Sequence, residues 1–213
     1  MAMQRSISSS SSKNVCDQIL RLGKQLEPGL NKHRTPCDIF INHRGIDTKR
    51  NVAGLLYEHI KNNLGLRPFL DSKNMKPGDK LFDKIDPAIR HCKIGVAIFS
   101  PQYCDSYFCL HELSLMMESK KRIIPVFCDV KPSELAVKDL NLNFPNKDLE
   151  KFNLALEEAK YTVGLTFDTL KGDWSEFLVK ASDAIMKNLY EVEREKFINR
   201  KKYIRRQHLL HNY

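Results

Sequence analysis

Long apolar segments are missing from this sequence of 213 residues. Its longest uninterrupted apolar run, residues 94–99, is far shorter than the roughly 20 residues that a membrane-spanning helix needs. The first 13 residues are rich in serine and lack the apolar core of a secretory signal. We therefore expect no membrane span and no entry into the secretory pathway.

The sequence also lacks the cysteine spacing of a metal site. None of its six cysteines forms a CxxC pair, and several lie in or beside apolar runs. A chain of this size without a secretory signal is expected to keep such buried thiols reduced in the cytosol. We therefore predict no metal site, no disulfide framework and a cytoplasmic location.

Acidic residues are missing from the C-terminal end, which makes the largest contribution to the net charge of +9. Residues 1–34 carry +4 and residues 196–213 carry +6, whereas the 161 residues between them carry −1. The basic ends leave contact with nucleic acid or a lipid surface, and a nuclear location, open. A bland alternative is a solvated helix end, where the macrodipole favours basic side chains. The central part is nearly neutral, so its function does not depend on this charge.

Short apolar runs alternate with amphipathic segments from residue 36 onward, which is typical of a parallel sheet covered by helices. We predict strands at 37–41, 66–70, 93–99 and 123–127, and a short edge strand at 161–165. Helices are expected near 52–60, 81–89, after Ser106, at 151–160, and from Trp174 into the basic tail. The predicted class is α/β with about five strands. Residues 14–30 have a loose helical spacing and form a docking helix or a linker.

Several catalytic signatures are absent from the loops that follow these strands. The sequence contains no GxGxxG, P-loop, HExxH or GxSxG motif, so the common Gly-rich nucleotide sites are not expected. In an open parallel sheet, functional groups gather outside the carboxyl ends of the strands. The residues at those positions include Asn42, His43, Arg44, Gly45, Asp71, Lys73 and Gly78.

The most unusual segment is Ser106 to Leu113. If Ser106 caps a helix, Phe108 and Glu112 lie 40° apart, roughly opposite the face that packs on the sheet. An aromatic ring one turn before a carboxylate is a plausible platform for a base or a pyridinium ring next to sugar hydroxyls. The alternative is a solvated glutamate beside a half-buried phenylalanine, and spacing alone leaves both open.

Four blocks of this sequence resemble the plant TIR (Toll/interleukin-1 receptor homology) domains, in the family order. Residues 37–48 (CDIFINHRGIDT) are similar to DVFLSFRGEDT, and Phe69-Leu70-Asp71 with Pro77-Gly78-Asp79 resembles the second strand and its loop. Residues 97–113 resemble VFSxxYxxSxWCLxEL, and residues 122–133 resemble VxPIFYDVxPS. We expect residues 1–34 to be an extension, 35–190 the TIR domain and 191–213 a basic helical tail.

The resemblance implies a flavodoxin-like fold with five parallel strands in the order 2-1-3-4-5. It also implies cleavage of NAD at the bond between nicotinamide and ribose, with no separate cofactor and with self-association as a condition for activity. Glu112 stands at the family's catalytic glutamate. The resemblance further implies a substrate cleft lined by Asn42, His43, Arg44, Gly45, Asp71, Lys73, Gly78, Ser106 and Phe108, in which Arg44 meets phosphate.

Departures from the family pattern leave alternatives open. Phe108 replaces the usual Trp, Asn42-His43 replaces Ser-Phe, and Gly54-Leu55 replaces a Ser-His pair of one self-association surface. The leading hypothesis is an NAD hydrolase or ADP-ribosyl cyclase in plant immune and cell-death signalling. A second is a non-catalytic TIR adaptor that pairs with other TIR domains. A third assigns the basic ends to nucleic acid, to which this family has been linked.

Overall fold

The structure of the chain is a computed structural model, and it describes residues 37–48, 51–137 and 146–210. Residues Arg34–Ser182 form one compact unit, and the chain from Asp183 onward belongs to a second. The whole sheet lies in the first unit. The docking helix or linker expected at 14–30 lies outside the described residues, as does Cys16.

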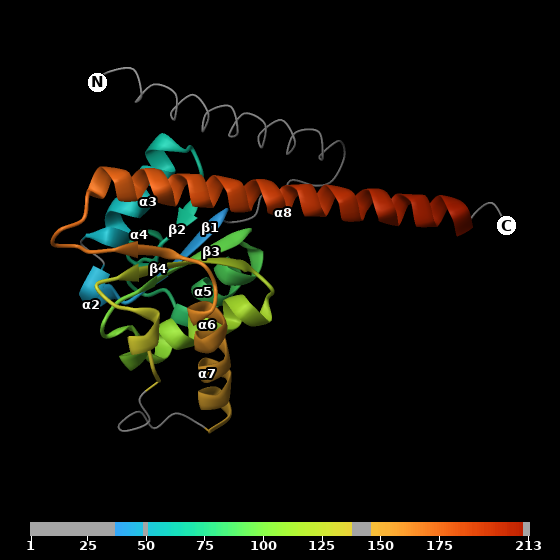
Figure 1. Cartoon of the computed structure of the whole chain (residues 1–213). Helices are drawn as coiled ribbons and strands as arrows, with labels where there is room; N and C mark the ends of the chain where they lie inside the picture. The colour runs from blue at the N-terminus through green and yellow to red at the C-terminus, as the bar shows by residue number, and fades with distance from the viewer. Residues whose placement is uncertain (1–36, 49–50, 138–145, 211–213) are drawn as a thin grey trace, which may run out of the picture. The chain divides into compact units, whose positions relative to one another are not determined.

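Five parallel strands form one sheet in the order β2-β1-β3-β4-β5, as predicted (Figure 1). They are β1 (Ile39–His43), β2 (Pro68–Phe69), β3 (Ile94–Phe99), β4 (Arg122–Cys128) and β5 (Leu165–Phe167). Every residue of β1 and of β3 is buried, because helices cover both faces of the sheet. Ile39 pairs with Ile94 and His43 with Ile98, so the carboxyl ends of β1 and β3 meet at one edge.

The longer helices of the first unit are α3 (Val52–Asn63), α5 (Leu81–His91), α6 (Tyr107–Glu118) and α7 (Asn146–Lys160). The short helices α2 (Gly45–Thr48) and α4 (Asp71–Asn74) follow β1 and β2, and the 3₁₀ turns are η1 (Tyr103–Asp105) and η2 (Pro132–Glu134). The helix α8 (Trp174–Leu210) begins in the first unit and continues into the second.

One hydrophobic cluster joins α5, α6 and α7 to one face of the sheet, and it includes Phe99, Phe127 and Phe152. The ring of Phe99 lies 4.6 Å from that of Tyr103 and 5.4 Å from that of Phe127, centroid to centroid. The buried residues of α3 are not part of this cluster, and α3 covers the opposite face (Figure 1).

Two predicted strands differ from the observed ones. The strand expected at 66–70 is only Pro68–Phe69, because Pro68 has no N–H and the N–H of Leu70 bonds Oδ1 of Asn74 instead. The strand expected at 161–165 begins only at Leu165. The N–H groups of Tyr161 and Thr162 still bond carbonyls of α7, so the chain has not yet left the helix there.

Candidate functional site

The candidate site lies where the carboxyl end of β1 meets the first turns of α6. Ser106 caps α6 as predicted, and its Oγ accepts a hydrogen bond of 3.3 Å from the N–H of Cys109. This cap fixes where the helix begins and therefore which way Glu112 points. Glu112 is turned inward and only 9% of its surface is exposed.

A network of hydrogen bonds holds the Glu112 carboxyl group. The side-chain amide of Asn42 donates to Oε2 of Glu112 at 2.8 Å and to the carbonyl of Cys109 at 3.2 Å. The hydroxyl of Tyr103 donates to Oδ1 of Asn42 and lies 3.1 Å from the Cys109 carbonyl. Asn42 and Tyr103 are both fully buried, so the inner side of the network is shielded from bulk solvent.

The pKa of Glu112 is raised to about 8, chiefly by burial; the hydrogen bond from Asn42 lowers it, and the carboxylates of Asp71 and Asp86 add to the rise. Burial also raises the pKa of the Cys109 thiol to about 12, so this neighbour stays uncharged near neutral pH. Glu112 is therefore mostly protonated at pH 7 in the free chain. A titratable carboxyl group with its midpoint near physiological pH is typical of a functional site.

The placement of Phe108 and Glu112 corrects one sequence-based expectation. Phe108 is 48% exposed, but Glu112 does not share its outward face, because Asn42 offers the carboxyl group a polar partner inside. The ring of Phe108 lies 6.0 Å from the ring of Phe82 and 5.9 Å from that of Tyr107. An exposed aromatic surface and a buried carboxyl group thus lie on successive turns of α6.

Arg44 and Gly45 directly follow β1. Arg44 is half-buried, and its positive charge lowers the pKa of the Cys109 thiol, although burial of the thiol outweighs it. Gly45 is exposed at the start of α2, and a side chain there would meet open space. Asp47, in the same short helix, accepts a hydrogen bond of 2.5 Å from Ser100 at the end of β3.

Of the residues that follow β2, Asp71 lies next to the site and Lys73 points away from it. Oδ1 of Asp71 lies 3.9 Å from Nε2 of His43, whereas Nζ of Lys73 pairs with Oε1 of Glu58 on α3 at 2.9 Å. Gly78 has a φ of 94°, a left-handed conformation that glycine adopts without strain. The structure thus brings Asn42, His43 and Asp71 to the same edge as Glu112, and it directs Lys73 toward α3.

Three residues that contact the site residues were not predicted from the sequence. Tyr103 was visible only as a motif position, and its bond to Asn42 depends on the fold. Phe82 adds a 43% exposed ring beside Phe108. His111 lies 3.2 Å from Asp86 of α5, and no spacing signal in the sequence links these two residues.

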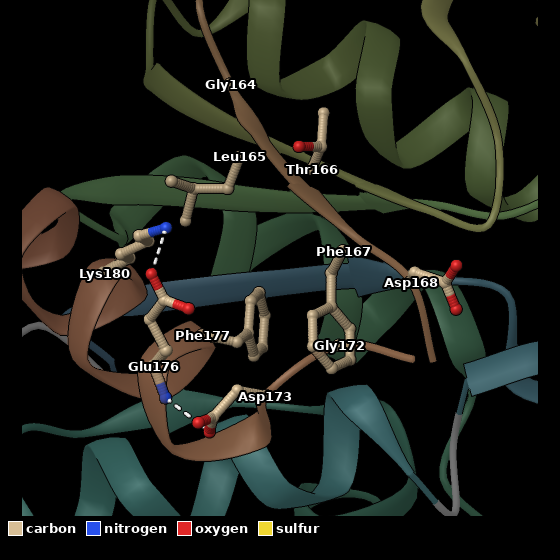
Figure 2. A pocket seen from close by; sticks show the side chains of 10 residues that line it. All are labelled: Gly164, Leu165, Thr166, Phe167, Asp168, Gly172, Asp173, Glu176, Phe177 and Lys180. Atoms are coloured by element: carbon tan, nitrogen blue, oxygen red, sulfur yellow. Dashed lines mark hydrogen bonds and ion pairs between the residues drawn. The ribbon is translucent and has the colours of Figure 1, made fainter. Parts of the chain in front are cut away.

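A separate hollow of about 280 Å³ lies at the edge of the sheet, between β5 and the first turns of α8 (Figure 2). Phe167 and Phe177 form its floor, and Glu176 and Lys180 lie at its rim. None of the expected site residues lines it. Across 37–48, 51–137 and 146–210, no helix is long and apolar enough to cross a membrane, and no His, Cys, Asp and Glu side chains gather as a metal site would require.

The decisive comparison is with family models, where the TIR domain matches residues 39–154. The chain belongs to the TIR domain family. A protein of Brachypodium distachyon named "Probable 2' cyclic ADP-D-ribose synthase BdTIR" is 52% identical over 160 residues, which cover 73% of this chain and 70% of that protein. The TMV resistance protein N of Nicotiana glutinosa is 35% identical over 106 residues, which cover 48% of this chain and 9% of that protein.

Solved structures confirm the fold of this TIR domain. The TIR domains in the structure of the activated Roq1 resistosome, which directly recognizes the pathogen effector XopQ, match with a TM-score of 0.58 at 27% identity. The match covers 72% of this chain and 99% of that chain. The predicted family and strand order are therefore both confirmed.

Proposed function

We propose that this TIR domain cleaves NAD between nicotinamide and ribose, releasing nicotinamide and either ADP-ribose or a cyclic ADP-ribose isomer. The observation that carries the proposal is the inward-turned carboxyl group of Glu112, held by Asn42 at 2.8 Å one turn after an exposed aromatic ring. The relative named as a probable 2′ cyclic ADP-D-ribose synthase, at 52% identity, supports the same reaction class.

The chemistry needs only one acidic side chain. The bond from C1′ of ribose to the pyridinium nitrogen breaks, and its electron pair neutralises the nicotinamide, which is already a good leaving group. A carboxylate at Glu112 stabilises the positive charge that develops at C1′. Water or a ribose hydroxyl then attacks C1′, and its proton passes to the carboxylate. Attack by water gives ADP-ribose, and attack by a hydroxyl gives a cyclic isomer.

The raised pKa of Glu112, about 8 through burial, fits this sequence of events. A positively charged pyridinium ring near the carboxyl group favours its ionised form, so binding of NAD lowers the pKa of Glu112. The carboxylate is thereby generated where and when it is used. Phe108 supplies the stacking surface, and Arg44 meets a phosphate of the substrate. NAD is the substrate, and no further cofactor takes part.

Activity in this proposal requires self-association, and the site serves plant immune and cell-death signalling in the cytoplasm. The fold similarity to TIR domains of an assembled resistosome supports self-association. Leu55 on α3 is 46% exposed and stands where many plant members have His, so the contacts of this surface differ from theirs.

A non-catalytic adaptor is the second candidate, and two observations favour it. Phe108 offers a smaller ring than the usual Trp, and Gly54-Leu55 replaces the Ser-His pair. Contact of the basic ends with nucleic acid is a separate prediction and is compatible with either function.

The test is nicotinamide release with product identification, using concentrated protein, the Glu112→Ala variant and a Glu118→Ala control. Glu118 lies on the same helix but pairs with Lys151 at the surface. We expect wild type and Glu118→Ala to consume NAD and Glu112→Ala to be inactive. Intact NAD with all three proteins, together with a cellular response that survives Glu112→Ala, would establish the adaptor instead.

A further inference from the structure

The hydrogen atoms of the Asn42 network can be assigned one by one. The Tyr103 hydroxyl has a single proton, which it gives to Oδ1 of Asn42. The two amide protons of Asn42 then go to the Cys109 carbonyl at 3.2 Å and to Oε2 of Glu112 at 2.8 Å. Every donor is used, and reversing the Asn42 amide would place its oxygen against the Cys109 carbonyl, which can only accept. The Cys109 carbonyl, together with the Tyr103 hydroxyl that donates to Oδ1, therefore fixes which way the amide points.

This assignment makes the two oxygens of Glu112 different. Oε2 must act as an acceptor, because the atom that faces it is an N–H donor in either protonation state of the carboxyl group. Because the carbonyl oxygen of a carboxylic acid is a stronger acceptor than its hydroxyl oxygen, the acid form places its proton on Oε1. No described residue forms a hydrogen bond with Oε1, and Glu112 keeps 9% of its surface exposed.

We propose that Asn42 is a positioning residue: oriented by Tyr103, its amide holds Oε2 of Glu112 and leaves Oε1 as the oxygen that faces the substrate and exchanges the proton. This inference rests on the proposed function in taking NAD as the substrate, but the hydrogen bond from Asn42 to Glu112 does not depend on that function. It revises the role that the family resemblance implied for Asn42, which was direct contact with substrate. Asn42 is fully buried, which fits a supporting role better than a binding one.

The charged groups around Glu112 set the direction of the effects. Asp71 on α4 and Asp86 on α5 both raise the pKa of Glu112, and each has a histidine nearby, His43 at 3.9 Å and His111 at 3.2 Å. On its own helix Glu112 faces the thiol of Cys109, which in turn is near the cation of Arg44. The Asn42 amide is the hydrogen-bond donor that favours the carboxylate against burial. Removing it must therefore raise the pKa of Glu112.

The experiment compares wild type with Asn42→Leu, which removes the donor at similar volume, and Tyr103→Phe, which keeps the ring. Ser114→Ala is the matched control, because Ser114 is a buried hydroxyl on α6 that bonds the carbonyl of His111 instead. Two quantities are measured for each protein. The first is the pKa of Glu112, from the ¹³C chemical shift of its carboxyl carbon. The second is the dependence of kcat and KM for nicotinamide release on pH.

We expect the pKa of Glu112 to rise by about one unit in Asn42→Leu, which corresponds to the loss of one hydrogen bond to a charged group. Tyr103→Phe should raise it in the same direction by less, and Ser114→Ala should not change it. The rising limb of kcat/KM, which reports the free protein, should move with the measured pKa, so that kcat/KM at pH 7 falls about tenfold in Asn42→Leu. The rising limb of kcat, which reports the substrate complex, should move in the same direction.

Two results would overturn the inference. One is an unchanged pKa of Glu112 in both variants. The other is a KM that rises in Asn42→Leu without any shift of the pH profile, which would mean that Asn42 contacts the substrate directly. Failure of the proposed function has a different signature. In that case the ¹³C titrations shift as expected, but none of the proteins releases nicotinamide.

Discussion

Glu112 connects the fold to the chemistry through its surroundings. Its carboxyl group is buried against β1, receives one neutral donor from Asn42 and lies near two other carboxylates. Folding therefore favours its acid form, whereas the proposed mechanism requires substrate binding to favour its carboxylate. Because the folded state favours the acid form, ionisation of Glu112 at alkaline pH lowers the free energy of unfolding.

The first prediction concerns the free energy of unfolding of Glu112→Gln. Burial raises the pKa of Glu112 from 4.5 to about 8, so between these pH values the folded chain holds a proton that the unfolded chain has lost. Wild type must then lose stability as the pH rises from 4.5 to 8, whereas the amide side chain of the variant does not titrate. At about 1.4 kcal/mol per pKa unit, the variant gains up to roughly 5 kcal/mol on wild type over this range.

Urea denaturation of both proteins at pH 5, 6.5 and 8 measures this difference. Glu118→Gln serves as the control, because the Glu118 side chain is 48% exposed and its difference from wild type should stay flat. A difference between Glu112→Gln and wild type that does not change with pH would contradict the raised pKa.

The second prediction concerns Phe108, whose ring is half-exposed beside Phe82. Phe108→Trp enlarges the stacking surface and should lower KM for NAD severalfold, whereas Phe108→Ala should raise it. Stacking of this kind contributes about 1 kcal/mol, which is roughly a fivefold change. Leu154→Ala, a truncation of another exposed apolar side chain, is the control. Steady-state kinetics decide, and equal KM values for the three residues at position 108 would exclude stacking on this ring.

At the scale of elements, α6 positions the site because it begins at a defined residue. Ser106 is its N-cap, and the N–H of Leu110 also bonds the Ser106 carbonyl at 3.2 Å. The side chain of Glu112 can meet Asn42 only if the first turn of α6 keeps this start.

The third prediction follows from this cap. Ser106→Ala should lower the free energy of unfolding by about 1 kcal/mol, the usual cost of losing an N-cap side chain. It should also lower nicotinamide release at saturating NAD, since the first turn carries Phe108. Urea denaturation and kinetics measure the two effects, with Ser133→Ala, an exposed serine of η2, as the control. Equal stability of Ser106→Ala and wild type would show that the cap does not set the helix start.

Some of these elements could be predicted from the sequence and others could not, for physical reasons. The runs of β1 and β3 were readable because strands buried on both faces have no polar alternation. The length of β2 could not be predicted, since it depends on the hydrogen bond from the N–H of Leu70 to Oδ1 of Asn74. Helical spacing placed Glu112 beside Phe108 but could not place it inside, because the partner that draws it in comes from β1, 70 residues earlier.

At the scale of the whole molecule, the excess of basic residues and the candidate site lie in different parts of the chain. Residues 196–213 carry six basic and no acidic side chains, and the site lies in Arg34–Ser182. The basic residues from Arg200 to Arg205 are exposed. We therefore assign no part of the proposed NAD cleavage to this end.

The fourth prediction is that deletion of 196–213 leaves nicotinamide release by the concentrated protein within about twofold of wild type. The deletion lowers the net charge from +9 to +3. Retention on single-stranded DNA should weaken and lose part of its dependence on salt, because fewer counterions are released. Binding isotherms at several salt concentrations measure this. A truncated protein without NAD cleavage would mean that the tail supports the site or its assembly.

The most direct test of the account is the time course of nicotinamide release from NAD by wild type and Glu112→Gln at equal, high concentration. Circular dichroism at the same pH confirms that both are folded. We expect stoichiometric nicotinamide and an ADP-ribose product with wild type, and a rate at least a hundredfold lower with the variant, since the carboxylate is lost. Equal rates of release with both proteins would contradict it.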